Sequence, residues 1–353
     1  MRISTADDRT VSPAPPADRV RPPLTWLVTG GAGYIGSHVV RQLLARGYRV
    51  VVLDDLSTGV PERVPDDVPL LPVAVTDRYA VAAALRRYQV RGVVHLAARK
   101  SPVESMLRPA WYYQQNVGGL ATLLRAMAET GVRRLLFSSS AAVYGIPDRP
   151  LVTEQSPTAP VNPYGRTKLL GERLISAACG QYRQLSWLAL RYFNVVGAAD
   201  PVLADRAPTN LVPLIFSALD TRHPITVTGT DYPTRDGTGV RDYVHVSDLA
   251  TAHLAAVERL CADRPARGAL NVGTGAGYSV LEVLRQTELV TGQPVPFRLG
   301  PRRPGDCPEV VADPTRIQRE LGWYPRHGLT DMITSSWLAW SAPPALVPAA
   351  VPG

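Results

Sequence analysis

Short runs of apolar residues alternate, along the first half of the chain, with longer segments whose apolar positions recur every three or four residues. Short apolar runs bounded by turn residues are typical of buried strands, and the three-to-four spacing is typical of amphipathic helices. The pattern predicts strands at residues 26–28, 49–53, 70–75, 92–96, 134–138 and 186–191. It predicts helices after the first strand through Ala45, at about 78–88 and at about 111–130. This alternation indicates an α/β fold with a parallel doubly wound sheet, in which ligands bind beyond the carboxyl ends of the strands.

Beyond Asn194 the alternation becomes irregular, with loops rich in proline and glycine. We expect a helix at about 212–220, a strand at 225–228, a strand and a helix within 242–259 capped by Ser247 or Asp248, and a strand at 269–273. The expected division is a doubly wound domain at 24–194, with part of 243–273 packing back onto it, and a smaller mixed domain at 195–340. Residues 1–23 and 341–353 lack periodic apolar positions, and we expect a disordered leader and tail there.

A glycine-rich loop joins the first predicted strand to the first helix. Gly30, Gly33 and Gly36 would let the backbone turn tightly, approach a pyrophosphate and pack helix on strand, with the phosphate charge at the helix N-terminus. The second strand ends in Asp54-Asp55, where a carboxylate would hold the adenosine ribose and repel a 2′-phosphate. The first domain is therefore expected to be an NAD-binding Rossmann domain.

Tyr164 and Lys168 lie four residues apart in a predicted helix, so both side chains can point into one site. A nearby cation would lower the tyrosine pKa towards working pH, and such a tyrosine can act as general acid and base. By chance alone such pairs occur on many surface helices. However, Lys168 and Lys100 are the only lysines in the sequence. Ser140 follows an apolar strand at the cofactor edge, so we expect it to hydrogen-bond at the reacting centre, although serines also commonly cap helices.

The composition excludes several other functions. The chain of 353 residues has a net charge of +8, but its arginines are scattered, which argues against nucleic acid and favours a small anionic substrate. Its apolar runs fall far short of the roughly 18 to 20 residues that span a membrane, and the N-terminus has no apolar signal-peptide centre. A cytoplasmic location is expected. Arg241, Arg302 and Arg303 could clamp a diphosphate, or could lie on the surface.

Cysteine and histidine offer no metal site in the sequence. The three cysteines lie far apart without a C-x-x-C pair and are expected to be reduced and structural. His38, His95 and His245 are expected to be isolated structural residues, so no metal is predicted.

Together these residues resemble the extended short-chain dehydrogenase/reductase superfamily and, within it, the UDP-glucose 4-epimerase (UDP-galactose 4-epimerase) family, over about residues 25–340. The superfamily features are the glycine loop, Ser140 and Tyr164-x-x-x-Lys168. Segments more specific to the epimerases are LDDLS at 53–57, SSSAAVYG at 138–145, RYFN at 191–194, NLVP at 210–213 and GTDYPTRDGTGVRDY at 229–243.

The resemblance implies interconversion of UDP-glucose and UDP-galactose by transient oxidation at sugar C4. Tyr164, assisted by Ser140, would take the proton of the 4-hydroxyl while the C4 hydride passes to tightly held NAD+. The 4-keto sugar would then swing about its diphosphate link and receive the hydride on its other face. Lys168 would also bond the nicotinamide ribose. A homodimer would form through helices near 104–129 and 164–178, unless the apolar faces there are simply core.

The family pattern also implies the binding residues. Those for NAD are Gly30, Gly33, Tyr34, Ile35, Gly36, Asp54, Asp55, Leu56, Ser57, Val75, Leu96, Ala97, Ala98, Lys100, Asn116, Ser138, Tyr164, Lys168 and Phe193. Those for the UDP-sugar, mainly in the 195–340 domain, are Ser140, Asn194, Asn210, Leu211, Thr226, Val227, Arg241, Arg303, Asp306 and Val310.

Two positions depart from the family pattern. Where the family has a Gly-Asp pair near the adenine, this chain has Val73-Ala74-Val75, which removes one adenine contact. Where some members carry a bulky tyrosine that excludes an N-acetyl group at C2, this chain has Val310. We therefore expect UDP-GlcNAc and UDP-GalNAc to be accepted as well.

Three other functions share parts of this pattern. A nucleotide-sugar 4,6-dehydratase needs an Asp-Glu dyad for elimination, and the matching positions are Ala141-Ala142. A net NAD-dependent sugar dehydrogenase would accumulate NADH. A catalytically silent dinucleotide sensor would have no need of Ser140, Tyr164 and Lys168 together.

Overall fold

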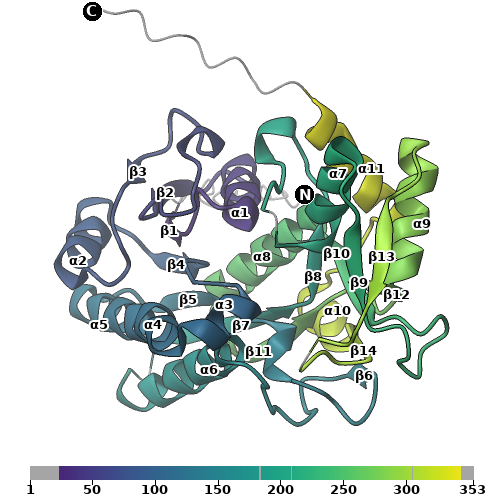
Figure 1. Cartoon of the computed structure of the whole chain (residues 1–353). Coiled ribbons are helices and arrows are strands. Elements are labelled where there is room, and N and C mark those ends of the chain that lie inside the picture. Colours follow the sequence, from purple (N-terminus) through teal and green to yellow (C-terminus); the bar gives the residue numbers. More distant parts are fainter. Residues whose placement is uncertain (1–23, 183, 208, 304, 343–353) are drawn as a thin grey trace, which may run out of the picture.

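The structure is a computed structural model that describes residues 24–342 except 183, 208 and 304. The leader expected at 1–23 lies outside the described residues, as does the tail expected at 341–353 apart from its first two residues; Ser341 is the last residue of a helix, so the expected tail boundary is wrong there. Figure 1 shows two parts side by side, one built around a large sheet and one around smaller sheets and the last helices.

A seven-stranded sheet forms the first part. Its strand order is β3-β2-β1-β4-β5-β7-β11, and every neighbouring pair is parallel. The strands are β1 (Thr25–Thr29), β2 (Arg49–Leu53), β3 (Leu70–Leu71), β4 (Gly92–His95), β5 (Arg134–Ser138), β7 (Ser186–Tyr192) and β11 (Arg267–Val272). The predicted parallel doubly wound sheet is confirmed.

Helices cover both faces of this sheet. They are α1 (Tyr34–Ala45), α2 (Arg78–Arg87), α3 (Pro102–Leu107), α4 (Pro109–Tyr112), α5 (Gly119–Thr130), α6 (Pro163–Gln181) and α8 (Val246–Cys261). Because side chains alternate along a strand, Trp26 and Val28 of β1 belong to the apolar core under α1 and α8, whereas Leu27 belongs to the core under α2, α5 and α6. The result is a three-layer sandwich.

The second part is mixed. A sheet in the order β12-β10-β14-β6, with β8 beside β10, contains one antiparallel pair, β10 with β12, and a separate parallel pair joins β13 to β9. The strands are β6 (Leu151–Val152), β8 (Asn194–Val196), β9 (Ile225–Thr228), β10 (Val240–His245), β12 (Gly277–Ser279), β13 (Phe297–Gly300) and β14 (Glu309–Ala312). The helices are α7 (Leu211–Thr221), α9 (Val280–Thr291), α10 (Thr315–Leu321) and α11 (Leu329–Ser341). A core of its own includes Phe216, Tyr243 and Met332.

Three predicted boundaries are wrong. The strand expected at 70–75 ends at Leu71, because Pro72 has no N–H for a ladder. The helix expected at 111–130 is divided into α4, a π-helical segment at Tyr113–Gly118 and α5. Helix α8 is capped by His245, whose ring nitrogen accepts from the backbone N–H of Ser247 at 3.0 Å.

Candidate active site

Helix α6 places Tyr164 and Lys168 in the interior. The side chain of Asn162 accepts the backbone N–H of Gly165 at 2.8 Å, and Pro163 occupies the first helical position, so the helix has a defined start. Tyr164 is 9% exposed and Lys168 is 4% exposed. The shared helical face expected from the sequence is therefore a buried face.

The electrostatics of this pair differ from the prediction. The Lys168 ammonium donates to the carbonyl oxygen of Ser138 at 2.8 Å and lies 5.9 Å from the centroid of the Tyr164 ring. Burial lowers the pKa of Lys168 to about 8. Burial also raises the pKa of Tyr164 above its ordinary value, and only its hydrogen bond with the Ser140 side chain opposes that shift. The expectation that Lys168 lowers the tyrosine pKa is wrong for the protein alone, because the ammonium is directed to a carbonyl.

Ser140 combines the two roles that the sequence left open. Its hydroxyl oxygen accepts the backbone N–H of Ala142 at 3.2 Å, which caps a short 3₁₀ turn, η3 (Ala141–Val143). The same side chain opposes the rise of the Tyr164 pKa, and both residues line one cavity. The serine is thus held on the side of the tyrosine by the turn that it caps.

Tyr164 and Ser140 open onto a cavity of about 800 Å³. Fourteen of the predicted site residues line it: Tyr34, Ile35, Lys100, Ser140, Tyr164, Phe193, Asn194, Asn210, Leu211, Thr226, Val227, Arg241, Arg303 and Asp306. They come from α1, α6 and α7, from β8, β9 and β10, and from loops between 96 and 307. The structure thus brings together residues from both ends of the chain.

Two predicted residues near the sugar and cofactor lie behind the lining. Val310 is 8% exposed and belongs to an apolar cluster with Phe193 and Leu169. Ser138 is buried, and its hydroxyl bonds the Tyr192 hydroxyl. The cavity lining therefore includes neither Val310 nor Ser138, and a role of Val310 in the space beside the sugar stays a prediction.

The glycine loop has the shape that a pyrophosphate needs. Gly30 adopts φ +73°, and a Cβ there would lie 2.7 Å from the backbone nitrogen of Ala97. A Cβ on Gly36 would lie 2.1 Å from the carbonyl oxygen of Gly30, so a side chain is excluded where α1 meets the loop. Around Gly33, at the start of α1, a Cβ would meet only the Gly30 oxygen, at 3.2 Å. The space above Gly33 and the uncapped helix N-terminus fit a dinucleotide phosphate.

Asp54 lies at the end of β2, beside the loop. Its carboxylate accepts the backbone N–H groups of Ala32 and Leu56, both at 3.0 Å, and burial raises its pKa. The bond to Leu56 holds that residue at φ +57°, in the left-handed region that non-glycine residues rarely adopt. Asp55 is more exposed, accepts from Ser57 and pairs with Arg99 at 3.5 Å. Asp54 therefore shapes the edge of the glycine loop, and Asp55 faces outward.

The remaining predicted cofactor residues lie along the same sheet edge, outside the cavity described above. Asn116 accepts the backbone N–H of Arg99 at 2.8 Å and donates to Thr167 at 3.0 Å, so it ties the loop after β4 to α6. Leu96, Ala97 and Ala98 form the start of that loop, and Val75 precedes α2. All of these residues are partly buried except Asn116, which is fully buried.

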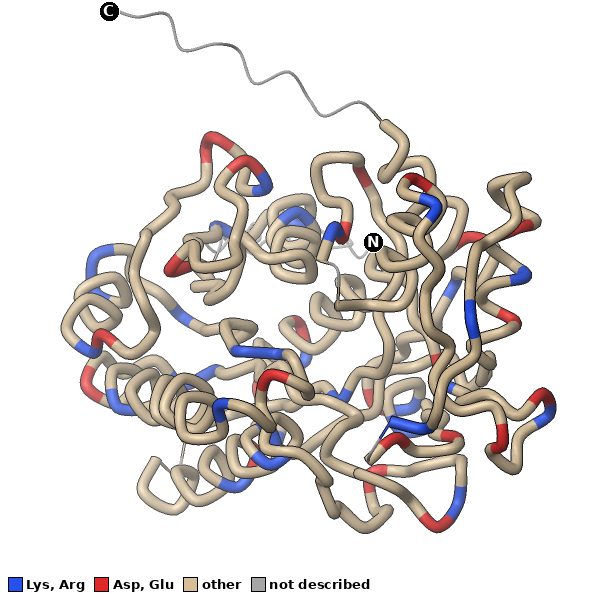
Figure 2. The backbone as a smooth tube through the Cα atoms, viewed as in Figure 1, with Lys and Arg blue, Asp and Glu red and all other residues tan. Residues whose placement is uncertain are grey.

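The cationic side of the cavity is formed by two of the three candidate arginines. Arg241 and Arg303 line it, together with Asp306. Arg302 instead pairs with Asp231 at 2.7 Å, and it is absent from the lining. Figure 2 shows that basic residues elsewhere are spread over the molecule and interspersed with acidic ones.

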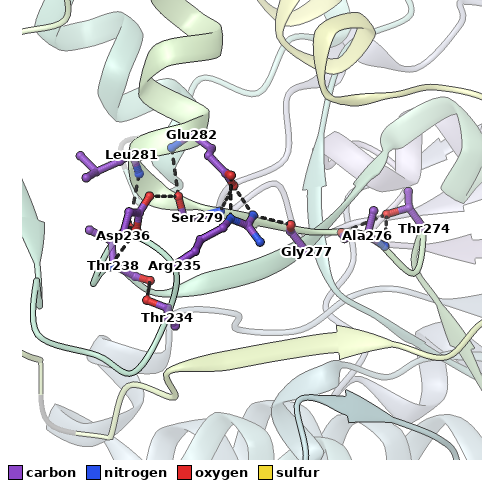
Figure 3. Close-up of polar contacts among 10 residues, drawn as sticks. All are labelled: Thr234, Arg235, Asp236, Thr238, Thr274, Ala276, Gly277, Ser279, Leu281 and Glu282. Carbon is purple, nitrogen blue, oxygen red and sulfur yellow. Dashed lines mark hydrogen bonds and ion pairs between the residues drawn. The ribbon is translucent and has the colours of Figure 1, made fainter.

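A loop at 229–239 borders this side of the cavity. Figure 3 shows how its second half is anchored: Arg235 bonds the Glu282 carboxylate and donates to the Gly277 carbonyl at 2.8 Å, and Asp236 accepts the Ser279 hydroxyl. The anchored loop carries Tyr232, which lines the cavity and lies under the Arg302 guanidinium, 4.4 Å from the ring centroid.

Sequence reasoning missed Tyr192, Tyr232 and Glu172. Tyr192 and Tyr232 line the cavity and stand inside segments that resemble the epimerases, so those segments could have identified them. Glu172 continues the buried face of α6 one turn beyond Lys168, and the four-residue spacing was the available signal.

The other predicted structural groups behave as follows. His38 and His95 are buried and hydrogen-bonded, but His245 is not isolated, because its ring stacks on His327 with centroids 4.2 Å apart. The three cysteines are free thiols. Within 24–342, apart from the three undescribed positions, there is no group of three metal-ligating side chains. None of the described helices is both long and apolar enough to cross a membrane.

Comparison with known proteins gives one consistent answer. A model of the NAD dependent epimerase/dehydratase family matches residues 26–273. A curated UDP-glucose 4-epimerase from Bacillus subtilis is 42% identical over 326 residues, covering 88% of this chain and 95% of that protein. A solved UDP-glucose-4-epimerase from Stenotrophomonas maltophila, with bound NAD and formylated UDP-arabinopyranose, superposes with a TM-score of 0.86 at 42% identity, covering 90% of this chain and 97% of that one.

A solved UDP-Glc/GlcNAc 4-epimerase from Campylobacter jejuni has a TM-score of 0.79 at 37% identity and covers 90% of this chain and 98% of its own. The chain therefore belongs to the NAD dependent epimerase/dehydratase family and, within it, to the UDP-glucose 4-epimerases.

Proposed function

We propose that the protein is an NAD-dependent enzyme that interconverts UDP-glucose and UDP-galactose by inverting sugar carbon C4. The observation that carries this proposal is that Tyr164 and Ser140 line the same cavity as Arg241 and Arg303. A proton-transferring phenol and a pair of diphosphate-binding cations thus share one enclosure.

Each group has a role in the proposal. NAD, when bound against the glycine loop and Lys168, supplies a reversible hydride acceptor for sugar C4. Tyr164 takes the proton of the sugar 4-hydroxyl and later returns it. Ser140 orients the sugar 4-hydroxyl towards the Tyr164 phenol. Arg241 and Arg303 hold the diphosphate through charge-assisted hydrogen bonds while the hexose turns in the cavity. The protein groups that bind tightly hold the nucleotide part of the substrate. The sugar is therefore free to present either face to the cofactor.

The test is an assay of four UDP-sugars, the glucose, galactose, GlcNAc and GalNAc forms, with the enzyme as purified and its NAD content recorded. We expect UDP-galactose to be converted to UDP-glucose without net NADH. Steady accumulation of NADH would indicate a dehydrogenase, and loss of water from the sugar would indicate a dehydratase. Either result contradicts the proposal.

The finer proposal is that UDP-GlcNAc and UDP-GalNAc are also substrates. Val310 is far smaller than a tyrosine and belongs to the same apolar cluster as Phe193, which lines the cavity. The Campylobacter jejuni relative is named for both the glucose and the GlcNAc substrate. An enzyme that converts UDP-galactose but leaves saturating UDP-GlcNAc untouched contradicts this extension alone.

A homodimer is proposed through the helices near 104–129 and 164–178, where α3 and α6 expose apolar side chains. Met106 and Leu107 of α3 are 62% and 79% exposed, and Leu170 of α6 is 38% exposed, while α3 packs against α6. Exposed apolar side chains gathered on neighbouring helices favour a partner of the same kind. Sedimentation equilibrium should give twice the chain mass, and the Met106→Glu/Leu107→Glu variant should give the single mass. A wild-type monomer at micromolar concentration contradicts the dimer.

The domain roles and the location remain proposals. We assign NAD binding to 24–194, with part of 243–273, and UDP-sugar binding mainly to 195–340. Helix α8 packs beside α1, and β11 pairs with β7. Both contacts support the assignment of part of 243–273 to the NAD-binding domain. The three free cysteines are consistent with a reducing, cytoplasmic environment.

A further inference from the structure

Three consecutive serines at the end of β5, residues 138–140, lie against one face of α6. Lys168 donates to the carbonyl of the first at 2.8 Å, and Glu172 accepts the hydroxyl of the second at 2.5 Å. The third, Ser140, lines the same cavity as Tyr164 and opposes the rise of the Tyr164 pKa. The three α6 residues are spaced by four, so they form one buried stripe. Two members of the stripe belong to the reacting centre, and the third, Glu172, does not.

Glu172 is fixed by a second partner on the neighbouring strand β7. Arg191 donates from Nε to one carboxylate oxygen at 2.9 Å and from Nη2 to the other at 2.6 Å, and both side chains are 8% exposed. A bidentate arginine–carboxylate pair fixes orientation as well as distance. Glu172 therefore joins α6 to two adjacent strands of the sheet, β5 and β7.

The third nitrogen of the Arg191 guanidinium is also hydrogen-bonded. Its Nη1 donates to the Tyr144 hydroxyl at 3.0 Å, and that hydroxyl donates to Asn271 of β11 at 2.6 Å. Buried ion pairs of this kind contribute little net stability, because desolvation offsets their attraction, whereas they do impose a particular geometry. The network therefore has more to do with where α6 sits than with how stable the fold is.

We propose that Glu172 and Arg191 are positioning residues that set the axial position and rotation of α6, and so the places of the Tyr164 hydroxyl and the Lys168 ammonium. This inference rests on the proposed function. Glu172 lies one turn from Lys168 and two turns from Tyr164, and a rigid helix transmits its placement along that length. Displacement of a reacting group by about 1 Å can cost on the order of 100-fold in rate.

The first test is the double variant Glu172→Leu/Arg191→Met, which removes both charges together and leaves no unpaired ion in the interior. We expect bound NAD and the Kd for UDP to remain within about threefold of the wild type, kcat to fall about 100-fold, and the pH profile of kcat to shift because both reacting groups have changed surroundings. A folded double variant with wild-type kcat and pH profile, measured well below its melting temperature, overturns the inference.

Ser139→Ala is the second variant and keeps the inference testable if the double variant does not fold. It removes only the hydroxyl that joins Glu172 to β5. We expect kcat to fall about tenfold, with UDP affinity retained and the pH profile shifted. Unchanged kcat and pH profile in this variant also overturn the inference.

Asp248→Asn is the matched control. Asp248 is 2% exposed and accepts the backbone N–H groups of Arg326 and His327 at 2.9 and 3.0 Å, outside the cavity lining. The control should lower the melting temperature and leave kcat and its pH profile unchanged. If the wild type does not turn over UDP-galactose, the proposed function has failed. If the wild type and the Glu172 and Ser139 variants turn over equally, only the positioning role has failed.

Discussion

The hydroxyl of Tyr34 donates a hydrogen bond to the carbonyl oxygen of Gly197 at 2.6 Å, across 163 positions of the chain. Tyr34 is the first residue of α1, directly after the glycine loop, and Gly197 follows β8 in the second part. Both residues are buried. One hydrogen bond thus ties the start of α1 to the mixed sheet of the second part, in which β8 pairs with β10.

The variant Tyr34→Phe should lower the free energy of unfolding by about 1 to 3 kcal/mol, because it leaves a buried carbonyl without this donor. Urea denaturation followed by circular dichroism measures the change. Tyr79→Phe is the matched control, since Tyr79 is 77% exposed and should unfold like the wild type. Equal midpoints for the two variants would show that the bond contributes nothing.

Tyr164→Phe should reduce kcat by about 100- to 10,000-fold, because it removes the hydroxyl that carries the proton and leaves the aromatic ring in place. The affinity for UDP should be unchanged, since Arg241 and Arg303 remain in place. Turnover and isothermal titration with UDP provide the two measurements. Tyr182→Phe, at the far end of the same helix, is the control. A Tyr164→Phe enzyme with kcat within threefold of the control would remove Tyr164 from the mechanism.

Much of the fold could be predicted because local patterns decide it. Alternating apolar runs and the glycine loop predict β1, α1 and a parallel sheet, and the predicted strand 225–228 coincides with β9. The helix α7 exceeds its prediction by one residue at each end. These elements depend on periodicity within a single segment, which the sequence displays directly.

Long-range contacts account for what could not be predicted. Glu172 and Arg191 meet only because α6 packs against β7 in one register, and no spacing rule gives that register. Val310 is 8% exposed and belongs to an apolar cluster with Phe193, and no local spacing in the sequence reveals that burial. Whether the pKa of Tyr164 is raised or lowered depends on how deeply the phenol is buried, which helical spacing does not reveal.

Acid should destabilise the protein through its buried histidines. Burial lowers the pKa of His253 to about 4, whereas the unfolded value is near 6.5. Between these values the unfolded chain takes up a proton that the folded chain does not, so the histidine favours unfolding increasingly as pH falls from about 6.5 to about 4. Above that pH window His253 does not change the free energy of unfolding, and below it the destabilising contribution of His253 is constant.

The matched test is His253→Gln, which removes this proton uptake. Between pH 6.5 and 4 the wild type should lose stability more steeply than the variant, by up to about 1.4 kcal/mol per pH unit. Other titrating groups contribute equally to both proteins, so the difference in slope isolates His253. Unfolding free energies at four pH values provide the comparison, and parallel slopes would contradict the assignment.

Val310→Tyr should narrow the substrate range. Val310 pairs in register with Arg241 and belongs to one apolar cluster with Phe193, and both of these residues line the cavity. Val310 is 8% exposed, so the extra volume of a tyrosine ring has to displace its neighbours or enter the cavity itself. In either case the space beside the sugar shrinks, and the substrate with the larger C2 substituent is affected more.

We expect the ratio of kcat/KM for UDP-GlcNAc to kcat/KM for UDP-glucose to fall at least tenfold in Val310→Tyr, since steric differences of a few atoms are worth about 10- to 200-fold. Val310→Ile serves as the control because it adds a single methylene and should leave the ratio within about threefold. The comparison uses ratios, so a general loss of activity in the tyrosine variant does not imitate the effect. An unchanged ratio in Val310→Tyr would mean that the ring is accommodated in the core, and that this position does not set the space next to C2.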